Sequence, residues 1–143
     1  MAASARTTES RTTAARSPLY SAVIGLAALA VLLQGLWAGL FLREGGGYRN
    51  SWVTVHAHGA EVAIALAAIA TIIAFIQLRS RREVLIGSVV FTLLLILEAY
   101  LGGKVSDDHS IGAQAVHIPL AMALMGLAVW LPLRASLRRT PAP

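Results

Sequence analysis

The chain has 143 residues, of which 57% are hydrophobic and 13% charged, and it carries a net charge of +5 with no cysteine. A soluble domain typically has about 25% charged residues, so this composition disfavours both a soluble enzyme and a disordered chain. Without cysteine, the sequence excludes disulfides, zinc–thiolate sites, cysteine nucleophiles and thiolate-ligated haem or iron–sulfur clusters.

Four long stretches of the chain are almost free of charge. In chain order they cover residues 18–42, 53–78, 84–103 and 112–133. Glu61 and Glu98 are the charged residues inside them. A helix needs roughly 20 residues to cross the hydrocarbon core of a bilayer, so each stretch predicts one transmembrane helix. The first apolar run is longer than that of a signal peptide, which predicts a retained helix. The predicted fold class is all-α, an integral membrane four-helix bundle over residues 18–133.

Basic residues gather outside these stretches in a consistent pattern. The tails, residues 1–17 and 134–143, and the connection Arg79-Ser80-Arg81-Arg82-Glu83 are basic, whereas the other two connections are nearly neutral or acidic. Because positive charge marks the cytoplasmic side of a membrane, both termini are predicted to be cytoplasmic. The composition of residues 1–17 and 140–143 predicts disorder. Topology explains the positive charge, so no nucleic-acid partner is expected.

Two short similarities relate the halves of the chain. The segment Leu33-Gln34-Gly35-Leu36-Trp37-Ala38-Gly39 aligns with Leu97-Glu98-Ala99-Tyr100-Leu101-Gly102-Gly103. Val55-His56 and Val116-His117 each begin a Val-His-x-x-x-Ala pattern. Together they predict a duplicated helical hairpin whose halves are related by a pseudo-twofold axis along the membrane normal. This symmetry makes His56 and His117 equivalent.

The histidines suggest a first functional interpretation, a b-type haem ligated by two imidazoles near the outer face. Helical bundles build cofactor sites from side chains on facing helices, and imidazole is a common axial ligand of haem iron. His56 and His117 are the predicted iron ligands, because His56 begins a stripe of alanines at helical spacing. His58 points to the side of Glu61 and is the substitute for His56.

Other polar residues of the same outer layer have predicted supporting roles. Arg43, Arg49 and Lys104 would pair with the haem propionates. Glu98, Gln34 and Glu61 are candidates for a proton or polar relay, because ionisable groups inside a membrane are costly and suggest function.

Two alternatives remain open at this stage. His56, His58 and the run Asp107-Asp108-His109 would supply ligands for a divalent metal ion at the outer surface, since imidazole suits zinc, copper and nickel. In the other alternative the chain is a non-redox accessory subunit without a cofactor, and its histidines are interfacial.

The motifs also resemble a known family. Gln34-x-x-x-x-Gly39, a histidine at a helix start, Leu101-Gly102-Gly103-Lys104-Val105 and Val116-His117-x-x-x-Ala121 resemble one half of the haem A synthase family, which is built from two four-helix haem-binding bundles. They are also similar to small four-helix bacterial membrane proteins with one such bundle. The resemblance implies haem ligation by His56 (or His58) and His117. Because this chain has one bundle and Glu61 follows its histidines, it implies haem binding rather than haem A synthesis.

These observations together lead to one working hypothesis. The chain is expected to lie in the cytoplasmic membrane of a bacterium and to bind one haem b near the outer face. A single haem there cannot carry electrons across a core roughly 30 Å thick. Electron exchange with quinol or an outer-face redox partner is therefore expected, within a larger assembly of membrane subunits; whether the chain is an enzyme stays open.

Overall fold

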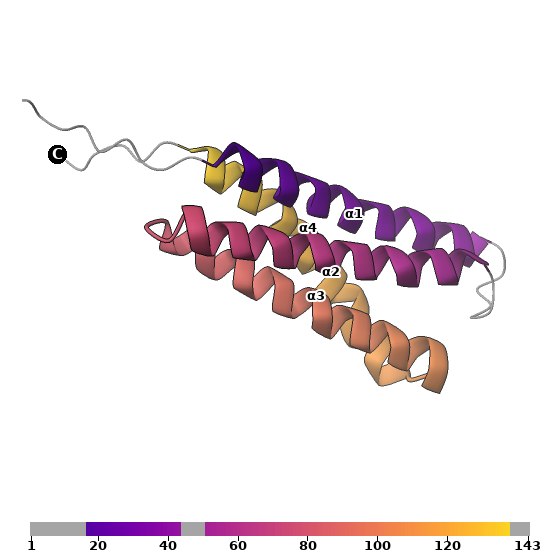
Figure 1. Cartoon of the computed structure of the whole chain (residues 1–143). Coiled ribbons are helices and arrows are strands. Elements are labelled where there is room, and N and C mark those ends of the chain that lie inside the picture. Colours follow the sequence, from indigo (N-terminus) through magenta and orange to yellow (C-terminus); the bar gives the residue numbers. More distant parts are fainter. Residues whose placement is uncertain (1–16, 44–50, 138–143) are drawn as a thin grey trace, which may run out of the picture.

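The computed structural model describes residues 17–43 and 51–137, which form four α-helices (Figure 1). These are α1 (Pro18–Arg43), α2 (Ser51–Gln77), α3 (Arg82–Asp108) and α4 (Ile111–Ser136). Each is long and apolar enough to cross a membrane, which confirms the all-helical prediction and indicates a multi-pass membrane protein. Most of the two predicted tails, residues 1–16 and 138–143, lies outside the described residues, as does Arg49.

The helices form a ring in which each packs against two neighbours. The contacts run from α1 to α2, α2 to α3, α3 to α4 and back from α4 to α1. Within the described ranges, α1 and α3 are diagonal partners without close backbone contacts, and so are α2 and α4. The helix starting at Pro18 and the helix ending at Ser136 meet at the same end of the bundle (Figure 1). We call this the terminus end, and the opposite end the loop end.

The third helix is longer than the sequence predicts. It passes through Gly102-Gly103 and ends only at Asp108, five residues beyond the predicted boundary. A salt bridge of 2.7 Å between Lys104 and Asp108 stabilises the added turn, because residues four apart face each other on a helix. His109 then takes a left-handed conformation with φ of 52°, and the Ser110 N–H donates back to the Lys104 carbonyl at 3.2 Å. Such a cap satisfies carbonyls at a helix end.

The fourth helix also continues beyond its predicted end, to Ser136, and a buried arginine caps it. Arg81 in the α2–α3 connection is 2% exposed. Its guanidinium donates to the Arg134 carbonyl at 2.7 Å and the Leu137 carbonyl at 3.4 Å, and pairs with Glu83 at 3.3 Å. The last carbonyls of a helix have no partner within it, so Arg81 joins this connection to α4 by satisfying two of them.

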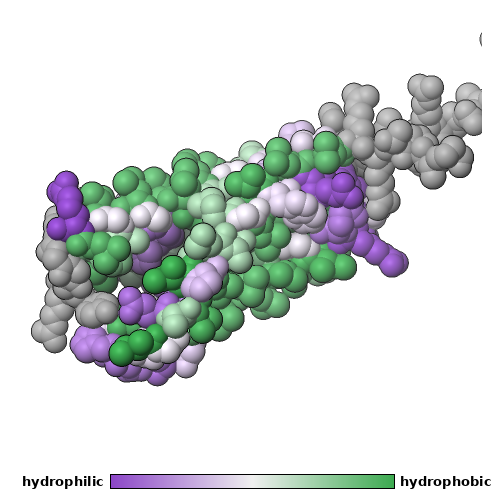
Figure 2. All heavy atoms as spheres, turned by 180° about the vertical axis from the view of Figure 1, so that it is seen from behind, coloured by the Kyte–Doolittle hydropathy of each residue, from purple (hydrophilic) through white to green (hydrophobic). Residues whose placement is uncertain are grey.

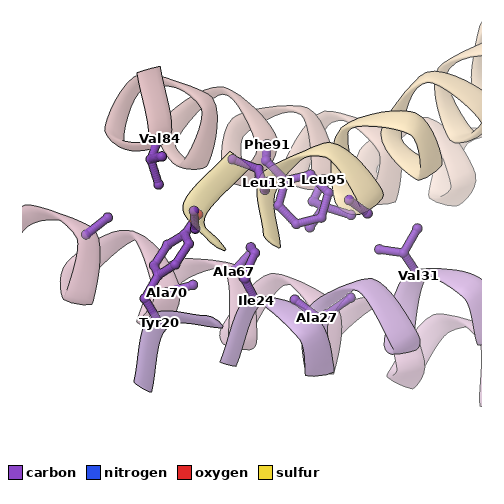
Figure 3. Close-up of a cluster of buried hydrophobic side chains, with 14 of the residues drawn as sticks. Tyr20, Ile24, Ala27, Val31, Ala67, Ala70, Val84, Phe91, Leu95 and Leu131 are labelled. Carbon is purple, nitrogen blue, oxygen red and sulfur yellow. The ribbon is translucent and has the colours of Figure 1, made fainter. Parts of the chain in front are cut away.

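The hydrophobic core, part of which Figure 3 shows, lies by its residue numbers in the half of the bundle nearer the terminus end. Its largest fully buried side chains are Tyr20, Phe91, Ile24, Leu78, Leu124 and Leu131. On α2 all buried positions except Ile73 are small and helically spaced: Gly59, Ala63, Ala67, Ala70 and Ala74. Small residues let membrane helices approach closely, so the alanines from Ala63 onward serve helix packing.

Interhelical hydrogen bonds reinforce this half of the bundle. The Tyr20 hydroxyl of α1 lies 2.7 Å from Ser88 Oγ of α3. Thr71 of α2 donates to the Ser88 carbonyl at 3.1 Å and lies 3.0 Å from Thr92 Oγ1. Because no water competes in a membrane interior, polar side chains of this kind can join helices, here the diagonal pair α1 and α3 as well as the neighbours α2 and α3.

The outer surface of the bundle is apolar over most of its length (Figure 2). Large side chains such as Leu26, Ile72, Leu93 and Met122 are more than half exposed. Soluble monomers rarely expose contiguous apolar surface of this extent. The surface therefore fits a lipid bilayer, with hydrophilic side chains concentrated at the two ends.

Candidate functional site

A polar layer begins where the hydrophobic core stops. The last buried core residue of α1 is Val31 and that of α3 is Leu95, and Gln34 and Glu98 follow each of them by three residues. On α4 the buried residues start only at Leu124, so His117 lies in the same loop-end half. At the loop end, hydrophilic side chains are visible between the upper and lower parts of the bundle (Figure 2).

In the α1–α2 half of this layer, a glycine allows close contact. Gly59 is buried, and a Cβ at this position would overlap both the Trp37 ring and the Gln34 amide nitrogen. One turn earlier on α2, His56 Nδ1 lies 3.1 Å from the Gln34 carbonyl oxygen, to which it donates as the Nδ1–H tautomer. The Phe41 ring meets the His56 ring edge-on at 5.7 Å between centroids. These contacts fix the orientation of the imidazole.

The α3–α4 half has the corresponding arrangement. His117 Nδ1 lies 3.1 Å from Glu98 Oε1, and the two side chains are only 21% and 12% exposed. The pair is within ion-pair distance but lacks the alignment of a hydrogen bond. The imidazole lies over Gly102, where a Cβ would be 3.3 Å from His117 Cε1. In both histidines, therefore, Nδ1 faces a residue of the preceding helix.

Several buried polar atoms in this layer have no hydrogen-bond partner among the described residues. They are both amide atoms of Gln34, both carboxylate oxygens of Glu98 and Nδ1 of His117. His56 is close enough to His117 and Glu98 to interact electrostatically with both. Unsatisfied buried polar atoms are rare in proteins and often indicate a missing water, ion or ligand.

The second histidine of α2 lies outside this layer. His58 and Glu61 are 72% and 77% exposed, and His58 Nδ1 lies 3.4 Å from Glu61 Oε2 on the outward face of the helix. Thus the structure brings together His56, His117, Gln34 and Glu98, whereas His58 and Glu61 form a separate pair. The assignment of either histidine as an iron ligand stays a prediction.

The predicted basic partners lie at the ends of their helices. Arg43 is exposed in the last turn of α1. Lys104 pairs with Asp108 and also lies 5.9 Å from the Tyr100 ring centroid. Within residues 17–43 and 51–137, no three His, Asp or Glu side chains are grouped so that they could hold a metal ion. The divalent-metal hypothesis therefore gains no support.

Sequence reasoning did not identify the two glycines as part of the site. Gly59 stands three residues after His56, and Gly102 faces His117 from the neighbouring helix. A glycine within an apolar helix is a signal of close approach, but its partner becomes known only from the packing.

Comparison with known proteins adds no relationship, because no family model, curated protein or solved structure matches the chain.

Proposed function

We propose that the polar layer at the loop end binds one b-type haem, whose iron Nε2 of His56 and Nε2 of His117 would hold. The observation that carries this proposal is that Nδ1 of each ring faces an oxygen atom of the preceding helix. A histidine that ligates a metal almost always donates its other ring N–H to a carbonyl or carboxylate, which orients the ring. The Gln34 carbonyl is such an acceptor, and the Glu98 carboxylate lies within ion-pair distance of His117 Nδ1.

The position of the two histidines supports the same proposal. They belong to α2 and α4, which are diagonal partners in the ring of helices. Cofactor sites of helix bundles are built between facing helices. The buried hydrophobic core ends before this layer, so its side chains do not occupy the region between the histidines. The unpartnered Gln34 and Glu98 atoms are consistent with a bound group in that space.

The remaining predicted residues have roles that follow from their places. Arg43, at the end of α1, and Lys104, in the last turns of α3, lie at the loop end and would balance the haem propionates. Glu98 would orient His117 and, with Gln34, hold water or a proton beside it. The bound haem would supply one-electron chemistry. Electron exchange with a quinol or an outer-face redox partner, within a larger assembly, fits its place near one membrane surface.

The membrane orientation and the duplication belong to this proposal. We place the terminus end in the cytoplasm of a bacterium, because the exposed arginines Arg79, Arg82 and Arg134 cluster there. Two parallels support a duplicated hairpin. Gln34 and Glu98 each follow the buried core by three residues, and His56 and His117 each approach the preceding helix through Nδ1.

An absorption spectrum tests the haem. The protein purified in mild detergent from haem-replete cells is expected to show, after reduction, the sharp α-band of a six-coordinate b-type haem. His56→Ala and His117→Ala are each expected to abolish this band or convert it to a five-coordinate spectrum. His58→Ala is the matched control, because His58 is two residues from His56 but faces outward, and the band should be unchanged.

Two results would contradict the proposal at different levels. A colourless preparation from haem-replete cells would show that the protein does not bind haem. A coloured preparation in which His58→Ala loses the band and His56→Ala retains it would keep the haem and overturn the ligand assignment.

A further inference from the structure

The outward face of α2 carries two ionisable side chains deep in the membrane-spanning part of the helix. Glu61 lies three residues from Ile64, the midpoint of α2, which is roughly 4.5 Å at 1.5 Å per residue. His58 lies about 9 Å from the same midpoint. A helix centred in a hydrocarbon core roughly 30 Å thick therefore places both side chains inside the core.

Within the part of the chain that the structure describes, no residue covers this pair. Glu61 is 77% and His58 is 72% exposed, although α2 packs against α1 on one side and α3 on the other. In Figure 1, α2 lies in front between these neighbours, with its outer face free. Ionisable residues in membrane helices almost always face a protein interior or a water-filled cavity, because their exposure to lipid is costly.

We propose that a second copy of this chain covers the outward face of α2, giving a dimer about a twofold axis along the membrane normal. The argument for a second copy is that the patch is self-complementary. A twofold axis brings the same patch of both subunits together. In a parallel α2–α2 contact, the His58 imidazole of each copy then lies near the Glu61 carboxylate of the other, one turn away in depth.

The surrounding residues suit a helix–helix contact of this kind. Thr54, Ala57 and Ala65 are exposed on the same side of α2, and all are small. Small residues allow membrane helices to approach, and polar side chains between them add interhelical hydrogen bonds. The dimer contact is separate from the layer of His56 and His117, so it does not depend on haem binding.

Cysteine cross-linking in native membranes tests the contact, because the chain has no cysteine of its own. Ala65→Cys lies one turn from Glu61 on the proposed contact face. Ala123→Cys, exposed on α4, is the matched control on another face. Oxidation is expected to give a disulfide-linked species of twice the 15.1 kDa chain mass from Ala65→Cys and little from Ala123→Cys.

A second measurement ties the contact to the polar pair. Glu61→Leu is expected to weaken dimerisation roughly 5- to 30-fold, measured as the dimer fraction against protein-to-lipid ratio in vesicles. Equal cross-linking from both cysteines, or an unchanged dimer fraction in Glu61→Leu, would overturn the proposal. So would cross-linking of Ala65→Cys only to a chain of another mass.

Discussion

At the scale of single residues, the polar layer depends on side chains placed by two glycines. Because Gly59 has no side chain, the Gln34 amide and the Trp37 ring can contact the backbone of α2. In the same way, Gly102 lets His117 contact α3. The sequence singles out Gln34, Glu98 and both histidines because polar residues are rare in apolar helices. It does not reveal that each histidine approaches the preceding helix through Nδ1, because that depends on helix rotation and packing.

Replacing Gly59 by alanine is expected to destabilise the protein although alanine favours helix. The added methyl would overlap Trp37 and Gln34, and overpacking typically costs about 1–3 kcal/mol. Gly35→Ala is the control, since nothing lies within 4 Å of its Cβ position, and it should be neutral or stabilising by up to about 1 kcal/mol. Thermal unfolding followed by circular dichroism in mild detergent measures both variants. Equal midpoints for the two variants would show that the contacts around Gly59 are not tight.

At the scale of helices, the number and order of the four spans could be predicted from the absence of charge, and their ends could not. In the sequence, the charges of Lys104, Asp107 and Asp108 indicated a loop. These residues instead belong to the last turns of α3, because Lys104 and Asp108 pair along the helix. Likewise Arg134 was expected in the tail. It remains helical because Arg81, 53 residues earlier in the chain, caps the final carbonyls. Contacts between distant residues of this kind leave no local pattern.

Replacing Arg81 by glutamine is expected to lower the free energy of unfolding by about 1–3 kcal/mol, because the carbonyls of Arg134 and Leu137 lose a charged donor. The neighbouring Arg82 is exposed, so Arg82→Gln is the matched control and should stay within about 0.5 kcal/mol. Chemical unfolding in detergent, monitored by tryptophan fluorescence, gives both values. The cap would be unimportant if the two variants unfold alike.

At the scale of the whole molecule, the two ends differ in charge. The terminus end is basic, because its one glutamate among these residues, Glu83, is outnumbered by Arg79, Arg81, Arg82 and Arg134. At the loop end, Arg43 and Lys104 are balanced by Asp107 and Asp108. The positive-inside rule assigns the first end to the cytoplasm. Hydropathy thus predicts the four helices, whereas the orientation that charge indicates stays a prediction and the function of the polar layer depends on side-chain geometry.

Labelling of single cysteines tests this orientation. A membrane-impermeant maleimide is expected to label Asp107→Cys in intact cells, and Ser80→Cys only after permeabilisation. Both positions are exposed, and the chain itself gives no background label because it lacks cysteine. The opposite labelling pattern would invert the assigned topology and place the polar layer near the cytoplasm.

The even number of helices among the described residues, with α1 starting and α4 ending at the same end, has an evolutionary consequence. A tandem gene fusion of two such bundles needs no additional span to join them, and the second copy keeps the orientation of the first. Parallel repeats related by an axis along the membrane normal are produced in this way, whereas a bundle of three or five helices would give an inverted pair. The architecture can therefore grow by simple duplication while each bundle keeps its polar layer on the same side of the membrane.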